Sequence, residues 1–200
     1  MMHYFLEEVK EKFFNDEWYG PYDLIEFLIN TELWGWNRKG FIADVNKVLE
    51  EERSPYRIIG NIVAPLISKE EIKEIERVLK ANDKYNPVKI NLKNALKQFS
   101  KRPDPDYANS IKESISAVEA LARISLNNSK GSLGDLTNQL NIHPVLKESI
   151  KKLYGWTSDE SGVRHSEKES PSLSANEEEA RFMLVICSAF INYIISKSED

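Results

Sequence analysis

Residues 104–126 read DPDYANSIKESISAVEALARISL, a stretch that predicts one long helix. Asp104 and Pro105 are typical of the cap and the first residue of a helix. Apolar residues then recur every three or four positions and form a seam made of Ile111, Ile115, Val118 and Ala122. A polar set lies beside that seam at similar spacing, namely Asn109, Glu113, Ser116 and Glu119. The stretch therefore predicts a core helix with polar side chains along one flank.

The rest of the chain shows mainly the same helical periodicity. Two short apolar runs flank Gly60-Asn61 and predict a two-residue β-hairpin within 56–66. Helices are expected on both sides of it: 22–29, 41–52, a helix from Ser68 past Leu79, 88–100, two helices within 132–154 broken near Pro144, and 176–197. Ser174 and Glu177 are expected to form the capping box of the last of these. The fold class is thus mainly α, with a domain 1–82 that contains the hairpin and a helical domain 86–200.

Composition excludes several classes of protein. The 200 residues carry a net charge of −5, so the chain as a whole is not a duplex-DNA binder. The single cysteine, Cys187, excludes an intramolecular disulfide and fits a reducing compartment. No secretory signal is visible at the N-terminus, and the apolar run 182–195 is too short to span a bilayer. We therefore expect a cytoplasmic protein with no membrane partner.

The segment Gly162-Val163-Arg164-His165 is the best candidate for chemistry. An arginine holds a phosphate and a histidine moves a proton near pH 7, so the pair points to phosphate chemistry. Lysines near it in the sequence, Lys147 and Lys151 among them, form a local positive segment that could bind substrate. A carboxylate from the long helix, Glu113 or Glu119, could orient the imidazole. The alternatives are a solvent-exposed loop, a helix cap and, for Glu119, a surface pair with Arg123.

Other catalytic patterns are missing from the sequence. The histidines are far apart and Cys187 stands alone, so no zinc-type ligand spacing occurs and no metal is expected. Gly131-Ser132-Leu133-Gly134 lacks the lysine of a phosphate-binding loop, and no Gly-x-Ser-x-Gly motif is present. We expect no cofactor.

Several of these segments resemble a known family. The long helix, His143-Pro144-Val145-Leu146-Lys147, the stretch from Leu153 to His165 and Phe182-Met183-Leu184-Val185 are similar to the HEPN domain of AbiJ-like abortive-infection proteins. Trp18-Tyr19-Gly20-Pro21-Tyr22-Asp23-Leu24 and the hairpin resemble the amino-terminal module often joined to that domain. The resemblance covers nearly the whole chain.

The resemblance implies a bundle of four or five helices that commonly forms homodimers and often cleaves RNA without a metal. By this similarity His165 would take the proton of an RNA 2′-hydroxyl, Arg164 would stabilise the charged phosphate, Glu113 or Glu119 would hold the imidazole, and Ser116 would add a hydrogen bond. A regulatory or antitoxin partner is also expected.

The usual motif separates Arg from His by four to six residues, whereas here they are adjacent. The variant is therefore either an active ribonuclease or a non-catalytic module that binds nucleotide, RNA or a partner protein, and a purely structural interaction protein is a third reading.

Overall fold

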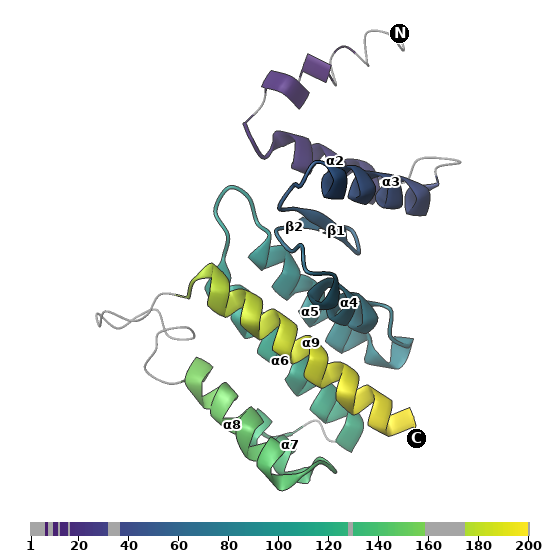
Figure 1. Cartoon of the computed structure of the whole chain (residues 1–200). Helices are drawn as coiled ribbons and strands as arrows, with labels where there is room; N and C mark the ends of the chain where they lie inside the picture. The colour runs from purple at the N-terminus through teal and green to yellow at the C-terminus, as the bar shows by residue number, and fades with distance from the viewer. Residues whose placement is uncertain are drawn as a thin grey trace, which may run out of the picture. The chain divides into compact units, whose positions relative to one another are not determined.

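A computed structural model describes residues 7, 10, 11, 13–15, 17–31, 37–127, 130–158 and 175–199. The chain divides into two compact units, of which the first comprises residues 1–68 with Arg102–Asp104 and the second comprises 69–101 with 105–200. The described part is mainly helical with one antiparallel hairpin, which confirms the predicted fold class at that level (Figure 1). The HEPN-like character of the bundle stays a prediction.

The first unit packs two helices on the hairpin. Helix α2 (Gly20–Asn30) has Pro21 in its first turn, and α3 (Arg38–Glu51) starts where Asn37 Oδ1 accepts a hydrogen bond from the Gly40 N–H at 3.1 Å. Strands β1 (Arg57–Ile59) and β2 (Ile62–Ala64) pair in the register Ile59↔Ile62, and Gly60 adopts φ +60° in the turn. The core of this unit is formed by Ile29, Ile58 and Val63.

Helix side chains hydrogen-bond the free edges of this short hairpin. On β1, Asn46 of α3 accepts from the Ile58 N–H at 2.7 Å and donates to the Ile58 carbonyl at 3.0 Å. On β2, Glu26 of α2 accepts from the Val63 N–H at 2.6 Å. Unpaired edge groups are costly when buried and invite pairing with other chains, so these two side chains replace missing neighbouring strands.

Arg102 completes the β2 edge. Its guanidinium donates to the Val63 carbonyl at 2.7 Å and pairs with Asp23 and Glu26, each at 2.8 Å. The Arg102 side chain is only 5% exposed, whereas its carboxylate partners are more open to solvent. A residue that follows α5 in the sequence therefore belongs to the ion-pair network of the first unit.

The second unit is built from α4 (Lys69–Leu79), the 3-10 turn η1 (Asp83–Tyr85), α5 (Asn86–Phe99), α6 (Tyr107–Leu126), α7 (Leu133–Gln139), α8 (Pro144–Ser158) and α9 (Glu177–Glu199). Helix α6 lies at its centre, because α5, α9, α7 and α8 all contact it. The predicted seam is confirmed, since Ile111, Ile115, Val118 and Ala122 are all buried. Burial of such side chains is the main source of stability for the bundle.

Three predicted helix ends are wrong. Helix α6 is capped by Asp106, whose Oδ1 accepts from the Asn109 N–H at 3.0 Å, and not by Asp104, which belongs to the first unit. Helix α8 continues past Tyr154 to Ser158, because no proline or charged cluster stops it there. The cap of α9 is at Asn176, where the Glu179 N–H donates to Asn176 Oδ1 at 2.9 Å, and not two residues earlier as predicted; Ser174 itself lies outside the described residues.

Candidate functional site

Arg164 and His165 lie outside the residues that the structure describes, and so does His3. The structure instead describes the frame of the predicted site. That frame consists of α8, which precedes the Arg-His segment, α9, which follows it, and α6, which carries the predicted supporting side chains.

The start of α9 lies beside the start of α6. Asn91 of α5 donates to the Ser116 carbonyl at 3.2 Å, and the Asp106 N–H donates to the Gln98 carbonyl at 3.0 Å, so α5 and α6 are antiparallel. On α4, Glu74 accepts from Asn192 of α9, and Arg77 donates to Ser196 at 2.8 Å, so α4 and α9 are parallel. Since η1 joins the end of α4 directly to the start of α5, the C-terminal ends of α9 and α6 must lie together. The two helices are therefore parallel.

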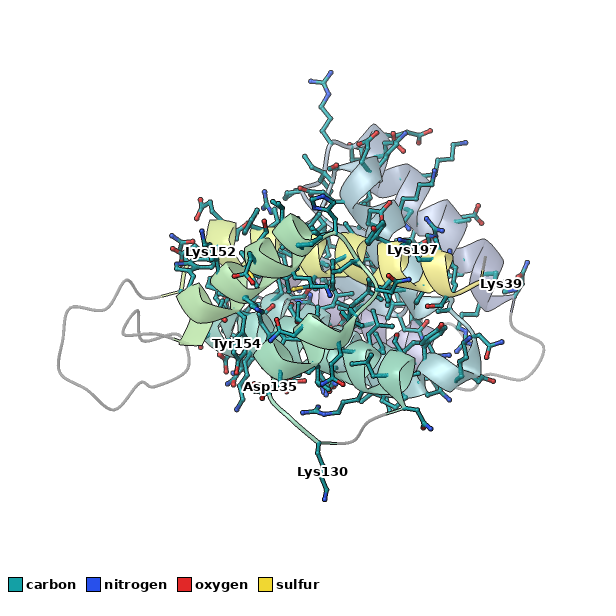
Figure 2. The ribbon with its side chains drawn as sticks, turned by 90° about the horizontal axis from the view of Figure 1, so that it is seen from below. Lys39, Lys130, Asp135, Lys152, Tyr154 and Lys197 are labelled. Carbon is teal, nitrogen blue, oxygen red and sulfur yellow. The ribbon has the colours of Figure 1, made fainter. Side chains whose placement is uncertain are left out.

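The end of α8 lies at this same end of the bundle (Figures 1 and 2). Its last turn is held by Thr157, which is fully buried and donates to the Tyr154 carbonyl at 2.9 Å. The chain thus leaves α8 and enters α9 close to the first turns of α6. The described ends of α8 and α9, which flank the Arg-His segment in the sequence, therefore lie at one end of the bundle.

The predicted supporting residues of α6 differ in how they are engaged. Ser116 donates to the carbonyl of Lys112 in its own helix at 2.9 Å. Glu119 faces Arg123 at 3.5 Å, the surface pair that the sequence offered as the alternative. Glu113 is half-buried and has no hydrogen-bond partner among the described residues, and it lies nearer to the start of α6 than the other two. Of the three side chains, Glu113 is the one available at the correct end.

Two buried polar atoms at this end also have no hydrogen-bond partner within the described part of the chain. One is the hydroxyl of Ser110, in the first turn of α6, and the other is Nε of Arg181, in the second turn of α9. Arg181 also pairs with Glu177 through its Nη2. Buried polar groups are nearly always satisfied in folded proteins, so this end of the bundle offers polar atoms to a further group.

The lysines of α8 are unequal as phosphate ligands. Lys147 donates to the Asn138 carbonyl at 2.8 Å, and Lys151 pairs with Glu148 at 2.8 Å. The hydrogen bond and charge of Lys151 lower the pKa of Glu148, so the Glu148 carboxylate that pairs with Lys151 is ionised at neutral pH. Lys152 is exposed (Figure 2), and among the described residues it has neither a hydrogen bond nor an ion pair, although its charge also acts on Glu148. Lys152 can therefore bind an anion without breaking a hydrogen bond or ion pair, whereas Lys147 and Lys151, which the sequence favoured, would each have to break one.

The distribution of charge separates the two parts of the chain. Residues 1–68 contain 12 acidic and 7 basic side chains, whereas residues 69–200 contain 20 of each. The first part therefore repels polyanions, and any nucleic-acid contact is expected in the second.

Comparison with protein families identifies the N-terminal part. Residues 2–81 match the family model described as AbiJ N-terminal domain 4. This part of the chain is similar to that family of AbiJ N-terminal domains. The match supports an AbiJ-like abortive-infection protein, as the resemblance predicted. No curated protein and no solved structure matches the chain.

The AbiJ match and the compact units divide the chain differently. The match includes α4, but Ile75 and Val78 of that helix are buried in the second unit, where α4 packs on α9. Arg102, which completes the first unit, lies 21 residues beyond the end of the match. The predicted domains 1–82 and 86–200 stay a prediction.

Sequence reasoning missed the network of Arg102 with Asp23 and Glu26. It treated residues 101–105 as a break between helices, because an arginine before a proline in a polar stretch has no periodicity that reveals burial. Asn46 was also missed, because a polar residue inside a predicted helix gives no sign in the sequence that it bonds the edge of a strand. Within the described ranges, no group of three or more His, Cys, Asp or Glu residues is placed to hold a metal ion.

Proposed function

We propose that this AbiJ-like protein is an abortive-infection effector whose second unit is a metal-independent endoribonuclease. The AbiJ domain at residues 2–81 is the observation that carries the proposal, since it supports the abortive-infection family. The Gly-Val-Arg-His segment adds the chemistry. It lies between α8 and α9 in the sequence, and the described ends of these two helices reach the start of α6, which supports the proposal.

His165 and Arg164 carry the reaction in this proposal. His165 takes the proton from a 2′-hydroxyl, whose oxygen attacks the adjacent phosphorus and displaces the 5′-oxygen of the next nucleotide. The leaving oxygen takes a proton from the imidazolium, so that the products are a 2′,3′-cyclic phosphate and a 5′-hydroxyl. Arg164 stabilises the charge on the phosphate oxygens, an effect that is worth several kcal/mol in enzymes, on the order of 3 kcal/mol.

Glu113 is the carboxylate we assign to the imidazole. Its half-buried position near the start of α6 and its lack of a partner in the described residues support this choice over Glu119, which has Arg123 beside it. Ser116 and the lysines Lys147 and Lys151 keep secondary roles, as a hydrogen-bond donor and as phosphate contacts. Lys152 joins them, because its ammonium group is exposed.

A non-catalytic binding module is the second candidate. The observation that favours it is the adjacency of Arg164 and His165, since side chains of neighbouring residues diverge unless the backbone turns between them. Such a module would hold nucleotide, RNA or a partner protein with the same side chains.

RNA cleavage in EDTA by the full chain and its variants tests the proposal. Arg164→Ala and His165→Ala should each abolish cleavage of RNA, while Ser166→Ala, a matched change in the same segment, should not. DNA of the same sequence should resist, because the nucleophile is the 2′-hydroxyl. Binding without cleavage by all proteins establishes the second candidate, and equal cleavage by all of them refutes the proposed site.

The assignment of Glu113 has a separate test. Glu113→Gln should lower kcat and move the acidic limb of the pH profile, because the carboxylate no longer supports the imidazolium. Glu119→Gln is the matched control on the same helix and should leave both unchanged. Equal effects of the two variants would contradict the choice of Glu113.

A further inference from the structure

Helix α5 carries lysines at a regular spacing. Lys89, Lys93 and Lys97 follow one another by four residues along the helix, and Lys101 continues the series just after the Ser100 cap. Residues four apart lie on one side of a helix, about 6 Å from each other along its axis. Lys93, Lys97 and Lys101 are all exposed, and we call these three side chains the lysine row.

The lysine row has no acidic side chain within it. Residues 84–103 contain no Asp or Glu, although the whole chain has more acidic than basic residues. Lys89 is held within the fold, because it pairs with Asp83 at 3.0 Å and donates to the Ala81 carbonyl at 3.1 Å. The ammonium groups of the row, in contrast, have neither a hydrogen bond nor an ion pair among the residues that the structure describes.

Elsewhere in the described structure, basic side chains pair with a carboxylate three or four positions away. These pairs are Lys47 with Glu51, Lys80 with Glu76, Arg123 with Glu119, Lys151 with Glu148 and Arg181 with Glu177. Like charges four residues apart repel each other and destabilise a helix. The helix dipole favours Lys97 in the last turn of α5, but it does not explain Lys93 in the middle of the helix. An anionic partner would remove the repulsion within the row.

The lysine row ends where the candidate site is predicted. Helices α5 and α6 are antiparallel, and the Asp106 N–H donates to the Gln98 carbonyl at 3.0 Å, so the end of α5 lies beside the start of α6. The end of α8 and the start of α9 reach this end of the bundle too (Figure 1). Lys101 is therefore level with the start of α6, and Lys93 lies about 12 Å away from it along the α5 axis.

We propose that the lysine row binds the phosphates of a single-stranded RNA that lies along α5 and reaches this end of the bundle. A single row of charges fits one phosphate backbone. The choice of RNA as the polyanion rests on the proposed function, since the row would hold the part of the substrate beyond the scissile bond. Contacts from lysine to phosphate carry no sequence information, so the row strengthens binding without selecting a sequence.

The side chains around the row favour RNA over a membrane or an acidic protein. A helix that binds a lipid surface places large apolar side chains on the buried face beside its basic ones, and protein interfaces are centred on apolar or aromatic anchors. The exposed positions in the C-terminal half of α5 are Lys93, Asn94 and Lys97, and the exposed Ile90 precedes them. Repeated charges without an apolar centre are the chemistry that recognises a polyanion.

Binding of an uncleavable oligonucleotide tests the inference independently of catalysis. The probe is a fluorescein-labelled single strand with 2′-O-methyl riboses, which lacks the nucleophile of the proposed reaction. The full chain should bind it, and Lys93→Gln/Lys97→Gln should raise the Kd at least about tenfold at low salt. The slope of log K against log salt concentration should become shallower by about 1.4, because each phosphate contact of a single strand contributes about 0.7.

Lys39→Gln/Lys197→Gln is the matched control. Both lysines are exposed and lie on other helices, and the double change removes the same charge from the chain (Figure 2). It should leave the Kd and the salt slope close to those of the wild type. Equal losses in the two double variants would show that only net charge matters and would overturn the inference. A wild type that does not bind, or undiminished binding by Lys93→Gln/Lys97→Gln, overturns it as well.

Cleavage assays separate this inference from the proposed ribonuclease. Lys93→Gln should raise KM for a long RNA and leave kcat unchanged, because the lysine contacts RNA away from the reacting bond. A dinucleoside monophosphate has only the scissile phosphate, so the variant should cleave it as fast as the wild type does. Binding through the row without any cleavage refutes the ribonuclease and supports the row. Cleavage of long RNA with a KM that Lys93→Gln/Lys97→Gln leaves unchanged refutes the row and leaves the ribonuclease in place.

Vesicles of phosphatidylserine and phosphatidylcholine test the membrane alternative. The full chain should stay in the supernatant when the vesicles are sedimented. Sedimentation with the vesicles that Lys93→Gln/Lys97→Gln abolishes, together with no binding of the oligonucleotide, would overturn the inference in favour of a lipid surface.

Discussion

Cys187 shows how burial controls the chemistry of a single residue. It is the only cysteine of the chain, and desolvation raises the pKa of its thiol to about 12. At pH 8 the thiolate is scarcely populated. We expect a disulfide reagent such as DTNB to leave the native protein unlabelled and to react fully in guanidinium chloride. Rapid labelling of the native chain would mean that α9 is not packed as described.

Arg102 shows the opposite case, a buried charge held by its partners. Removal of the guanidinium in Arg102→Ala leaves Asp23 and Glu26 facing each other and the Val63 carbonyl without its donor. We expect a loss of about 2 kcal/mol, below the value for a fully buried pair because both carboxylates are partly exposed. Hydrogen exchange at the β2 amides should accelerate by about 30-fold, since exchange follows the local opening free energy.

The matched control for Arg102 is its exposed neighbour, Lys101→Ala. In a background with Asp23→Asn and Glu26→Gln, the loss of the guanidinium should cost much less, because no charged group is then left unpaired. An equal cost in both backgrounds would show that packing of the side chain, and not its charge, stabilises the hairpin.

Single elements were predictable where the signal was local. The Gly60-Asn61 turn, the break before Pro144 and the seam of α6 are properties of short windows, and the structure confirms all three. The caps of α6 and α9 were misplaced by two residues each. Asp104 and Asp106 are equally good caps locally, and the choice between them depends on which segment joins the first unit. Long-range contacts of that kind leave no periodicity in the sequence.

Helix α7 gives a pH-dependent prediction. Ser132 and Asp135 form a capping box, and hydrogen bonds from the Ser132 hydroxyl and N–H lower the pKa of the Asp135 carboxyl below its usual 3.8. A lowered pKa stabilises the fold above the unfolded-state pKa, and this contribution is lost as the pH falls through the folded-state value. Ser132→Ala should therefore destabilise the protein at pH 7, and should destabilise it less below pH 3.8.

Urea unfolding at several pH values measures this effect. Asp135→Asn should remove most of the pH dependence of the Ser132→Ala cost, because the titrating partner is gone. Ser149→Ala on the exposed side of α8 provides the control, since its hydroxyl donates only to the Val145 carbonyl of its own helix at 3.0 Å. A cost that is constant from pH 7 to pH 3 would contradict a charged capping box.

At the scale of the whole molecule, sequence similarity and packing divide the chain at different places. The AbiJ match ends at residue 81, yet the second unit takes α4 from within the match and the first unit takes Arg102 from beyond it. The candidate site could be predicted only as residue types, Arg164, His165 and a carboxylate, because which carboxylate is available depends on the neighbours that Glu113 and Glu119 meet in three dimensions. A fragment cut at residue 81 would remove Arg102 from the network it completes.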